Sequence, residues 1–329
     1  MVPRSWAPDC PEGYDVADYV ASGADREAVL EVLRSAPPVG AVQKMMARYR
    51  EISSGHYRCI PWPWEYLTYY TRALIPGTIT LITGGAGSMK SLFLLQSCAR
   101  WMDDGEKVAV FQFEDDLEFH VNRFLAQRTG QSGYTDPDWV RQNLSLVRET
   151  TAALSEDIER FSRTWHIVDG ADTLEQVAAW IGHQAEAGKR IICVDPITLA
   201  ERTKQPWEAD KEFIKEVKRI ARRQQCSVVL VTHPQKGMEA DLTTLAGGAA
   251  YERFTFTVIV IQPHEKRESP MRTKYAGRMD ISHNVTIRVV KARNAPGHNV
   301  RLGYDFSTEG LSFTEKGVIL KRPRKGKGK

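Results

Sequence analysis

Five short apolar segments alternate with stretches of helical periodicity between residues 77 and 232. Continuous apolar runs are typical of strands that are buried on both faces of a parallel sheet. The predicted strands are ITLIT (79–83), KVAVFQF (107–113), TWHIV (164–168), RIICVD (190–195) and SVVLVT (227–232). The predicted helices between and after them lie near residues 91–103, 116–129, 173–187 and 207–224. This β–α repetition indicates an α/β domain with three layers.

The C-terminal part of the chain has a different pattern. Three further strands are predicted there, FTVIVI (256–261), VTIRVVKA (285–292) and VRLGYDF (300–306), and loops rather than helices join them. We therefore expect a mostly parallel central sheet, flanked by helices, that ends in an antiparallel hairpin region. The low-complexity residues 316–329 predict a disordered basic tail, which leaves residues 60–315 as the α/β domain.

Helical patterns also precede the α/β domain. Residues 14–36 predict two short helices, and either Ser22 or Asp25 can start the second. These helices make residues 1–38 a helical N-terminal segment.

A third helix is predicted over residues 39–52, because its apolar residues share one face: Val42, Met45, Tyr49 and Ile52. No partner for this face follows in the sequence. It packs either on its own domain or on another subunit. We interpret residues 39–59 as a linker helix and loop for subunit packing, and residues 53–76 as loop-like.

Composition excludes several classes of protein. The 329 residues carry a net charge of +4, but seven basic residues lie in the last 14 positions, so the rest of the chain is slightly negative. Binding of nucleic acid would therefore depend on local placement of charge or on the tail. The sequence contains no run of about 18 apolar residues, so it predicts no membrane span. The five Cys residues form no CxxC pair, which argues against a disulfide scaffold and favours a reducing compartment.

A phosphate-binding loop follows the first strand. The strand 79–83 leads into a loop of small residues and then into a helix, which is the context that such a loop requires. The expected nucleotide-binding residues are Gly84, Gly85, Ala86, Gly87, Ser88, Met89, Lys90 and Ser91. Backbone N–H groups and the helix N-terminus would hold the phosphates, Lys90 would reach the terminal phosphates, and Ser91 would bind Mg²⁺.

Met89 departs from the usual pattern, because a glycine normally precedes the lysine. A side chain is tolerated there only if it points away from the phosphates. The alternative is a glycine-rich turn between a strand and a helix that happens to carry Lys-Ser.

Three polar residues follow predicted strands. Asp195 ends the strand 190–195 and suits the hold on Mg²⁺ and its water, and Glu114 ends the strand 107–113 and suits activation of a water molecule. His233 follows the strand 227–232 and could contact the terminal phosphate. The structural alternatives are helix capping for Glu114, a strand-end turn for Asp195 and a purely structural His233.

With Lys90, Glu114, Asp195 and His233 in this order, the chain resembles the RecA-like ATPase domain of hexameric replicative helicases, of the DnaB, phage primase-helicase and Twinkle types. Further stretches carry the likeness over residues 60–313: FQFEDDLEFHVNRFLA (111–126), HIVDGADTLEQVAAWI (166–181), VTHPQKG (231–237), LAGGAAYERF (245–254) and VTIRVVKARNAPGHNVRLGYDF (285–306). The resemblance implies a RecA-like P-loop fold and an ATP-hydrolysing DNA helicase that forms a homo-oligomer, a hexameric ring.

The resemblance also assigns roles near the C-terminus. Lys291 and Arg293 would act on ATP bound to a neighbouring subunit, where a second cation can speed phosphoryl transfer by orders of magnitude. A solvated basic strand end is the alternative. Phe306, or less favourably Tyr304, would stack on adenine, although core packing explains both residues equally well.

Single-stranded DNA would contact loops that face a central channel. The candidates are Lys236, Gly237, Gly247, Gly248 and Arg253, because small residues let a phosphate approach the backbone and cations attract it. Bacterial members of the family often carry an Arg near position 246, where this chain has Ala, so Arg253 or Lys236 would supply the charge instead. For the glycines, a simple turn is the alternative.

The segment PEGYDVADYVASGADREAVLEVLRSA resembles the end of a TOPRIM primase domain. The resemblance to the replicative helicases implies a cytoplasmic replication protein with 5′-to-3′ movement, Mg²⁺-ATP and a primase or polymerase as partner. The TOPRIM metal carboxylates are absent from this sequence, so we predict no primer synthesis. Two rival functions remain open: a RecA/RepA-like ATPase that binds or loads single-stranded DNA without unwinding, and a nucleotide-gated structural protein in which Met89 marks lost hydrolysis.

Overall fold

A computed structural model describes residues 16–35, 40–55, 57–168, 172–203, 205–234, 241, 248–293 and 295–321. The chain divides into two compact units, Met1–Arg58 and Cys59–Lys329. The described residues of the smaller unit form the helices α1 (Val16–Ala21), α2 (Arg26–Ser35) and α3 (Ala41–Ser53).

The helices of the smaller unit follow the predicted pattern. Asp25 starts the second helix, because its carboxylate accepts a hydrogen bond from the Ala28 backbone N–H at 2.8 Å. Helix α3 has no buried residue, and Val42, Met45 and Tyr49 on its apolar face are all more than half exposed.

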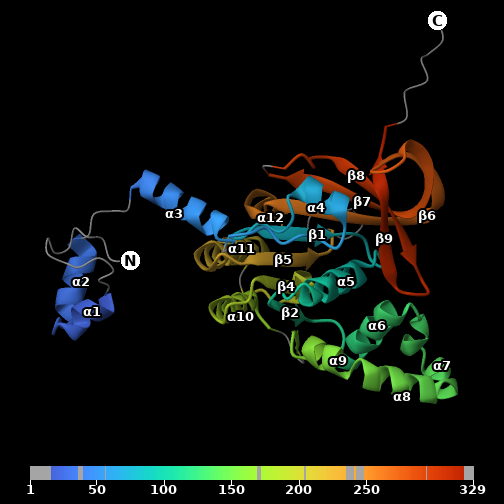
Figure 1. The fold of residues 1–329 in the computed structure, drawn as a ribbon, viewed down its shortest axis with the longest axis horizontal. Helices are drawn as coiled ribbons and strands as arrows, with labels where there is room; N and C mark the ends of the chain where they lie inside the picture. Colours follow the sequence, from blue (N-terminus) through green and yellow to red (C-terminus); the bar gives the residue numbers. More distant parts are fainter. Residues whose placement is uncertain are drawn as a thin grey trace, which may run out of the picture. The chain divides into compact units, whose positions relative to one another are not determined.

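The larger unit is built on a nine-stranded sheet within the described residues, in the order β3-β2-β4-β5-β1-β6-β7-β8-β9 (Figure 1). Strands β3 to β6 in this order pair in parallel, and the pairs from β6 to β9 are antiparallel. The strands are β1 (Ile79–Thr83), β2 (Val108–Gln112), β3 (Trp165–Ile167), β4 (Ile191–Asp195), β5 (Ser227–Thr232), β6 (Thr257–Thr273), β7 (Gly277–Ala292), β8 (Val300–Ser307) and β9 (Ser312–Ile319). The predicted mostly parallel sheet with an antiparallel end is confirmed.

Helices cover both faces of this sheet, because the parallel strands are buried on both sides. One hydrophobic cluster joins α5 and α4 to one face, and a second joins α10 and α11 to the other. The helices of this unit are α4 (Glu65–Thr71), α5 (Lys90–Asp103), α6 (Leu117–Thr129), α7 (Pro137–Gln142), α8 (Leu144–Ala153), α9 (Ser155–Ser162), α10 (Leu174–Glu186), α11 (Pro206–Gln224) and α12 (Gly248–Phe254). Short 3₁₀ helices lie at Ser132–Thr135 and Ile197–Leu199.

The antiparallel part extends further than the sequence predicts. Strands β6 and β7 continue through residues 262–284, where loops were expected, and they pair as far as Thr273 and Gly277. Many side chains on this extension are exposed and charged, so the apolar pattern that marks a buried strand is missing.

The predicted start of the tail is also wrong. Lys316 lies inside β9, which runs from Ser312 to Ile319 and pairs with both β8 and β6. Only part of β9 is buried, which explains why its sequence looks like a polar tail. Residues 322–329 lie outside the described residues.

The segment 53–76 is not all loop, because it contains α4. Buried aromatic residues tie this helix to the core: the Trp64 ring stacks on Phe93 with centroids 4.3 Å apart, and the Trp64 indole N–H donates to the Phe313 carbonyl. Across the described parts of the chain, no helix combines the length and the apolarity that crossing a membrane would require.

Candidate functional site

The polar residues predicted from the sequence meet at the carboxyl edge of the parallel sheet. Strands β2, β4, β5 and β1 are neighbours, and the last residues of β2 and β4, Gln112 and Asp195, are paired in register. Glu114 and His233 follow two of these strands, and α5 begins at Lys90 directly after the loop that leaves β1. The edge where parallel strands end is where ligands bind in α/β sheets.

The loop between β1 and α5 has a conformation that depends on small residues. A Cβ on Gly84 would lie 2.3 Å from the Ser88 Oγ and 2.7 Å from the Ile261 carbonyl oxygen, so only glycine fits. Gly87 has a φ of +70°, in the left-handed region. The Lys90 ammonium donates to the carbonyl oxygens of Gly84 and Gly85, both at 3.0 Å. The loop therefore curls around the end of the Lys90 side chain.

Met89 also adopts the left-handed region, with a φ of 63° and a ψ of 26°. This geometry explains why glycine is the usual residue at the position, since a Cβ is strained there. The Met89 side chain is half-buried and packs against the hydrophobic cluster on the α5 face of the sheet. That packing offsets part of the backbone strain.

Asp195 is 2% exposed, and Ser91 donates a side-chain hydrogen bond to it. Burial raises the pKa of Asp195 to about 7, which the bond from Ser91 and the charge of Lys90 oppose. Burial lowers the pKa of Lys90, while the negative charges of Asp195 and Glu114 counter that shift. The buried carboxylate and the buried ammonium thus stabilise each other's charged form.

Glu114 and His233 face each other, with the His233 Nε2 at 3.9 Å from a Glu114 carboxylate oxygen. Burial, followed by the charge of Asp115, raises the pKa of Glu114. Burial and the nearby charge of Lys90 lower the pKa of His233, which favours its neutral form. A carboxylate with a raised pKa is a better general base. The neutral imidazole beside it can respond when the charge or the position of Glu114 changes.

Arg123 on α6 belongs to the same cluster, and sequence reasoning missed it. Its guanidinium lies 3.7 Å from the centroid of the Phe119 ring, and its charge acts on Asp115, Asp195 and Glu114. Within the described residues it forms no ion pair at 4 Å or less, so it is a partly buried cation without a bound counter-charge. The signal available in the sequence was its position about two turns into the helix that follows Glu114.

The acidic residues after Glu114 have separate roles. Asp116 caps α6, since its carboxylate accepts a hydrogen bond from the Phe119 N–H at 2.7 Å. The cap of this helix is therefore Asp116 and not Glu114, the residue for which capping was the structural alternative. Asp115 does not cap the helix; burial raises its pKa, and the charge of Arg123 opposes that shift.

Lys291 and Arg293 lie at the opposite edge of the sheet, near the start of β6. The Lys291 ammonium donates to the Glu252 carbonyl, and Arg293 donates to the Arg253 carbonyl at 2.7 Å. Burial and the charge of Arg293 lower the pKa of Lys291 to about 8. The strand pairing of Thr257 with Ala292 puts these cations away from the loop of their own chain, at the amino ends of the parallel strands.

The remaining predicted contacts are only partly described. Lys236, Gly237 and Gly247 lie outside the described residues. Gly248 is the first residue of α12, and the exposed Arg253 lies at the other end of that helix.

Phe306 is half-buried, and its ring packs on Phe313 with centroids 4.9 Å apart. Stacking of Phe306 on adenine stays a prediction. Tyr304 is fully buried, and its hydroxyl donates to Glu315, so it is not available to a nucleotide.

The site suits a magnesium ion that is bound together with phosphate oxygens. No group of three or more His, Cys, Asp or Glu side chains in the described ranges could hold a metal ion without such help. The Ser91 hydroxyl and the Asp195 carboxylate are paired at the helix N-terminus, and both are oxygen ligands of the kind that Mg²⁺ prefers. The residues present therefore fit the ion.

Comparison with known proteins agrees with this geometry. The sequence profile of the AAA domain family matches residues 58–239. One similar solved structure is that of a DnaB-like replicative helicase, described together with its interactions with primase. It superposes with a TM-score of 0.62 and 16% sequence identity, and the match covers 91% of this chain and 71% of that one. The ATPase domain of G40P superposes with a TM-score of 0.61 and 17% identity, over 87% of this chain and all of that one (100%). No curated protein sequence matches the chain. The shared fold is the RecA-like ATPase fold.

Proposed function

The chain belongs to the AAA domain family, and from that premise we propose that it is the ATP-hydrolysing motor of a replicative-type DNA helicase. One observation carries the proposal: Lys90, Asp195 and Glu114 converge at the carboxyl edge of a RecA-like sheet. Their mutual charges suit the recognition and cleavage of a nucleoside triphosphate. Two solved structures that share this fold are a DnaB-like replicative helicase and the ATPase domain of G40P.

Each residue has a role that its surroundings support. Lys90 would exchange the loop carbonyls for the terminal phosphates of ATP and stabilise charge as the bond to the leaving group breaks. Glu114 would accept a proton from the attacking water, helped by its raised pKa. Arg123 would add a second positive charge from the side of the site that α6 forms.

Ser91 and Asp195 would hold Mg²⁺, which supplies neutralisation of phosphate charge when it is bound. Burial of Asp195 keeps water away from this part of the site, so its interactions are stronger than at the surface. His233 would couple the state of the site to the chain that follows β5, through its contact with Glu114.

The ATP site would be completed by a second copy of the chain. Lys291 and Arg293 lie too far along the sheet to serve their own loop, since they sit at its opposite edge. In a ring of identical subunits, six by analogy with the family, they would reach the nucleotide of a neighbour. The exposed apolar face of α3 offers a surface for packing on that neighbour.

Single-stranded DNA would be the track of the motor. The segment after β5, with Lys236, Gly237, Gly247 and Gly248, would contact its backbone, and Arg253 would add charge. Movement would run 5′ to 3′, in the cytoplasm of a bacterium or of an infected host cell. A primase or polymerase would be the partner, as interactions with primase are described for the DnaB-like helicase.

The test is unwinding of a forked DNA duplex together with ATP turnover in the presence of single-stranded DNA. We expect both activities in the unaltered chain and a loss of at least about 100-fold in turnover for Glu114→Gln, the size typical of a general base. Glu118→Gln is the matched control, because Glu118 is an exposed acid in the first turn of α6, the helix that follows Glu114.

The other outcomes select the rivals. Turnover that depends on DNA but never unwinds a fork would identify an ATPase that binds or loads single-stranded DNA. Absence of turnover in the unaltered chain would identify a nucleotide-gated structural protein and reject the motor.

A further inference from the structure

Basic residues lie within two positions of the start of three neighbouring parallel strands. Arg163 precedes β3 by two residues, Lys107 directly precedes β2, and Lys189 precedes β4 by two residues. The strand order β3-β2-β4 places these starts side by side at the amino edge of the sheet. This edge is opposite to the one that carries Lys90 and Asp195, and the cations form a row there.

A cavity of about 420 Å³ opens at this row. Its wall combines bases with a few apolar and polar groups, chiefly Met102, Lys107, Arg160, Arg163, Thr164 and Lys189. The acid among the lining residues is Glu106, which is 8% exposed. The charge that faces the cavity is therefore mainly positive.

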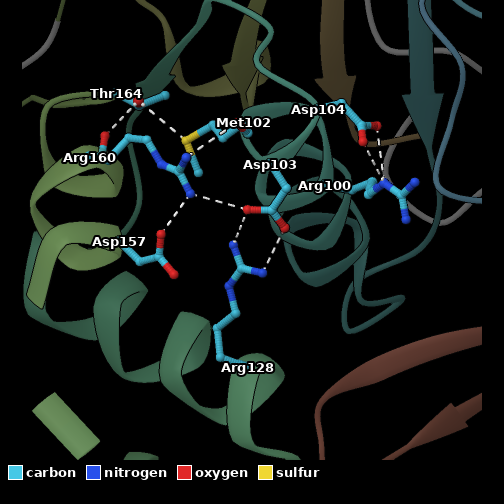
Figure 2. A network of polar contacts seen from close by, with 8 residues as sticks. All are labelled: Arg100, Met102, Asp103, Asp104, Arg128, Asp157, Arg160 and Thr164. Carbon is cyan, nitrogen blue, oxygen red and sulfur yellow. Dashed lines mark hydrogen bonds and ion pairs between the residues drawn. The ribbon is translucent and has the colours of Figure 1, made fainter. Parts of the chain in front are cut away.

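Arg160 is fixed by its own counter-charges. Figure 2 shows its guanidinium between Asp103, at 3.1 Å, and Asp157, at 2.7 Å, while Arg128 approaches Asp103 from the other side. The Thr164 hydroxyl donates to the Arg160 carbonyl at 2.9 Å and ties the start of β3 to α9. This network holds one side of the cavity in place, but the two carboxylates largely neutralise the charge of Arg160.

Lys107 and Lys189 differ from Arg160 in this respect. The Lys189 ammonium donates to the Val108 carbonyl oxygen at 2.9 Å. In the described ranges neither lysine has a carboxylate within ion-pair distance, although Lys189 is partly buried. Burial and the charge of Lys107 both lower the pKa of Lys189. Two like charges are thus held at one cavity without a counter-ion, which is unfavourable unless an anion joins them.

We propose that this cavity binds the phosphate group of a ligand between Lys107 and Lys189, with Arg163 at its rim. The two ammonium groups supply positive point charges and N–H donors to the oxygens of a phosphate. The Arg163 side chain is free to turn inward, because its ion pair with Glu159 is 3.8 Å long and exposed. The phosphate belongs either to a small phosphorylated molecule or to the backbone of a nucleic acid. The inference is independent of the proposed ATPase.

The first experiment is calorimetric titration of the full chain with inorganic phosphate at constant ionic strength. The Lys90→Ala substitution is made first, so that the loop between β1 and α5 does not contribute. Adding Lys107→Gln and Lys189→Gln to this background should weaken phosphate binding at least tenfold. The matched control adds Lys211→Gln and Lys266→Gln, which remove two exposed lysines elsewhere and should change the affinity less than twofold.

The thermal midpoints of the proteins are compared first, to show that both double substitutions leave the fold intact. Suppose that both double variants have the thermal midpoint of the Lys90→Ala chain, and that the variant with Lys107→Gln and Lys189→Gln binds phosphate as tightly as that chain. The cavity is then not the site, and the proposal fails. It fails as well if the Lys90→Ala chain binds no phosphate. Lys189→Arg provides a second check, because a retained charge should retain binding to within about threefold.

A second arm identifies the source of the phosphate. Binding of a single-stranded oligonucleotide to the otherwise unaltered chain is measured over a range of salt concentrations, with and without the Lys107, Lys189 pair. If nucleic acid is the ligand, the slope of log affinity against log salt should fall by about one to two when the pair is removed. An unchanged slope together with lost phosphate binding assigns the cavity to a small phosphorylated molecule.

Discussion

The two edges of the parallel sheet carry charge in opposite ways. At the carboxyl edge, Glu114 and Asp195 surround a single buried ammonium, that of Lys90. At the amino edge, Lys107 and Lys189 meet without an acidic partner among the described residues. Both sets lie on the same strands, since β2 and β4 begin at one edge and end at the other.

The two edges differ in how their charges are balanced. At the carboxyl edge the opposite charges offset one another, yet burial still shifts the pKa values of Lys90, Glu114 and Asp195 away from their usual ranges. The cluster therefore favours binding of a triphosphate with its cation, because the added charges would offset the remaining cost of burying these charged groups. At the amino edge Lys107 is exposed and Lys189 is partly buried, and an anion alone would balance their charges. The comparison predicts that substitutions at the two edges have different consequences.

The largest effect is expected for Lys90→Ala, which should reduce ATP turnover at least about 100-fold, because it removes the cation at the transferred phosphate. Lys107→Gln should leave turnover within about twofold, since Lys107 lies at the other edge. Both are measured as steady-state phosphate release at saturating DNA. Equal losses in the two variants would abolish the distinction between the edges.

The second effect concerns Arg123. Replacing it by Gln should lower turnover by roughly 10- to 100-fold, as expected for loss of one cation near the transition state. The measurement is turnover at saturating ATP, with the affinity for a non-hydrolysable analogue determined separately.

Arg128→Gln is the control on the same helix. Arg128 points to the network of Figure 2, where it pairs with Asp103 at 2.6 Å. Its loss should cost about 1 kcal/mol of stability, since the pair is mostly buried, and should leave turnover unchanged. Turnover that falls equally in both variants would show that α6 acts only as a support.

Arg123 also shows the limit of what the sequence predicts about the site. Glu114, Asp195 and His233 could be placed because each ends or directly follows a strand, and parallel strands end at a common edge. Lys90 could be placed because it follows the loop that leaves β1 at the same edge. Arg123 lies inside a helix, where its direction depends on how α6 packs against the sheet. The stacking of its guanidinium on Phe119 fixes that direction, and a local pattern does not contain it.

The fold divides in the same way. The five parallel strands were predicted within about two residues, because continuous apolar runs are a local signal of burial on two faces. The extension of β6 and β7 and the strand β9 were not predicted, since Lys266 remains exposed there and Lys316 is only partly buried. Pairing between strands, as in Met271 with Ile319, supplies what their sequence lacks.

The third effect concerns His120 and tests how much a buried polar group without a hydrogen-bond partner reduces the stability of the fold. This residue is 3% exposed, its Nε2 has no hydrogen-bond partner, and burial lowers its pKa to about 4. The unfolded chain takes up the proton near pH 6.5, whereas the folded chain does so only near pH 4. Stability is therefore lost as the pH falls through this window, by about 2 kcal/mol at pH 5.

His120→Leu should remove that loss. Urea unfolding of the variant and of the unaltered chain is compared at pH 7.5 and at pH 5, and the variant should gain about 2 kcal/mol relative to the unaltered chain between the two. His183→Leu, at an exposed position on α10, should show no such gain. A difference that does not change with pH would mean that the folded protein binds the proton at His120 as readily as the unfolded one.

The smallest effect isolates backbone strain in the loop itself. Met89→Ala and Met89→Gly both remove the packing of the thioether, but only the glycine relieves the left-handed conformation at a φ of 63°. That relief amounts to about 1–2 kcal/mol, of which the greater freedom of glycine in the unfolded chain takes back about 0.5–1 kcal/mol. Met89→Gly should therefore be more stable than Met89→Ala by roughly 0.5–1 kcal/mol in urea unfolding. Inside a helix the order of the two residues is the reverse, so a more stable alanine variant would place Met89 within α5 and not at the turn that shapes the carboxyl edge.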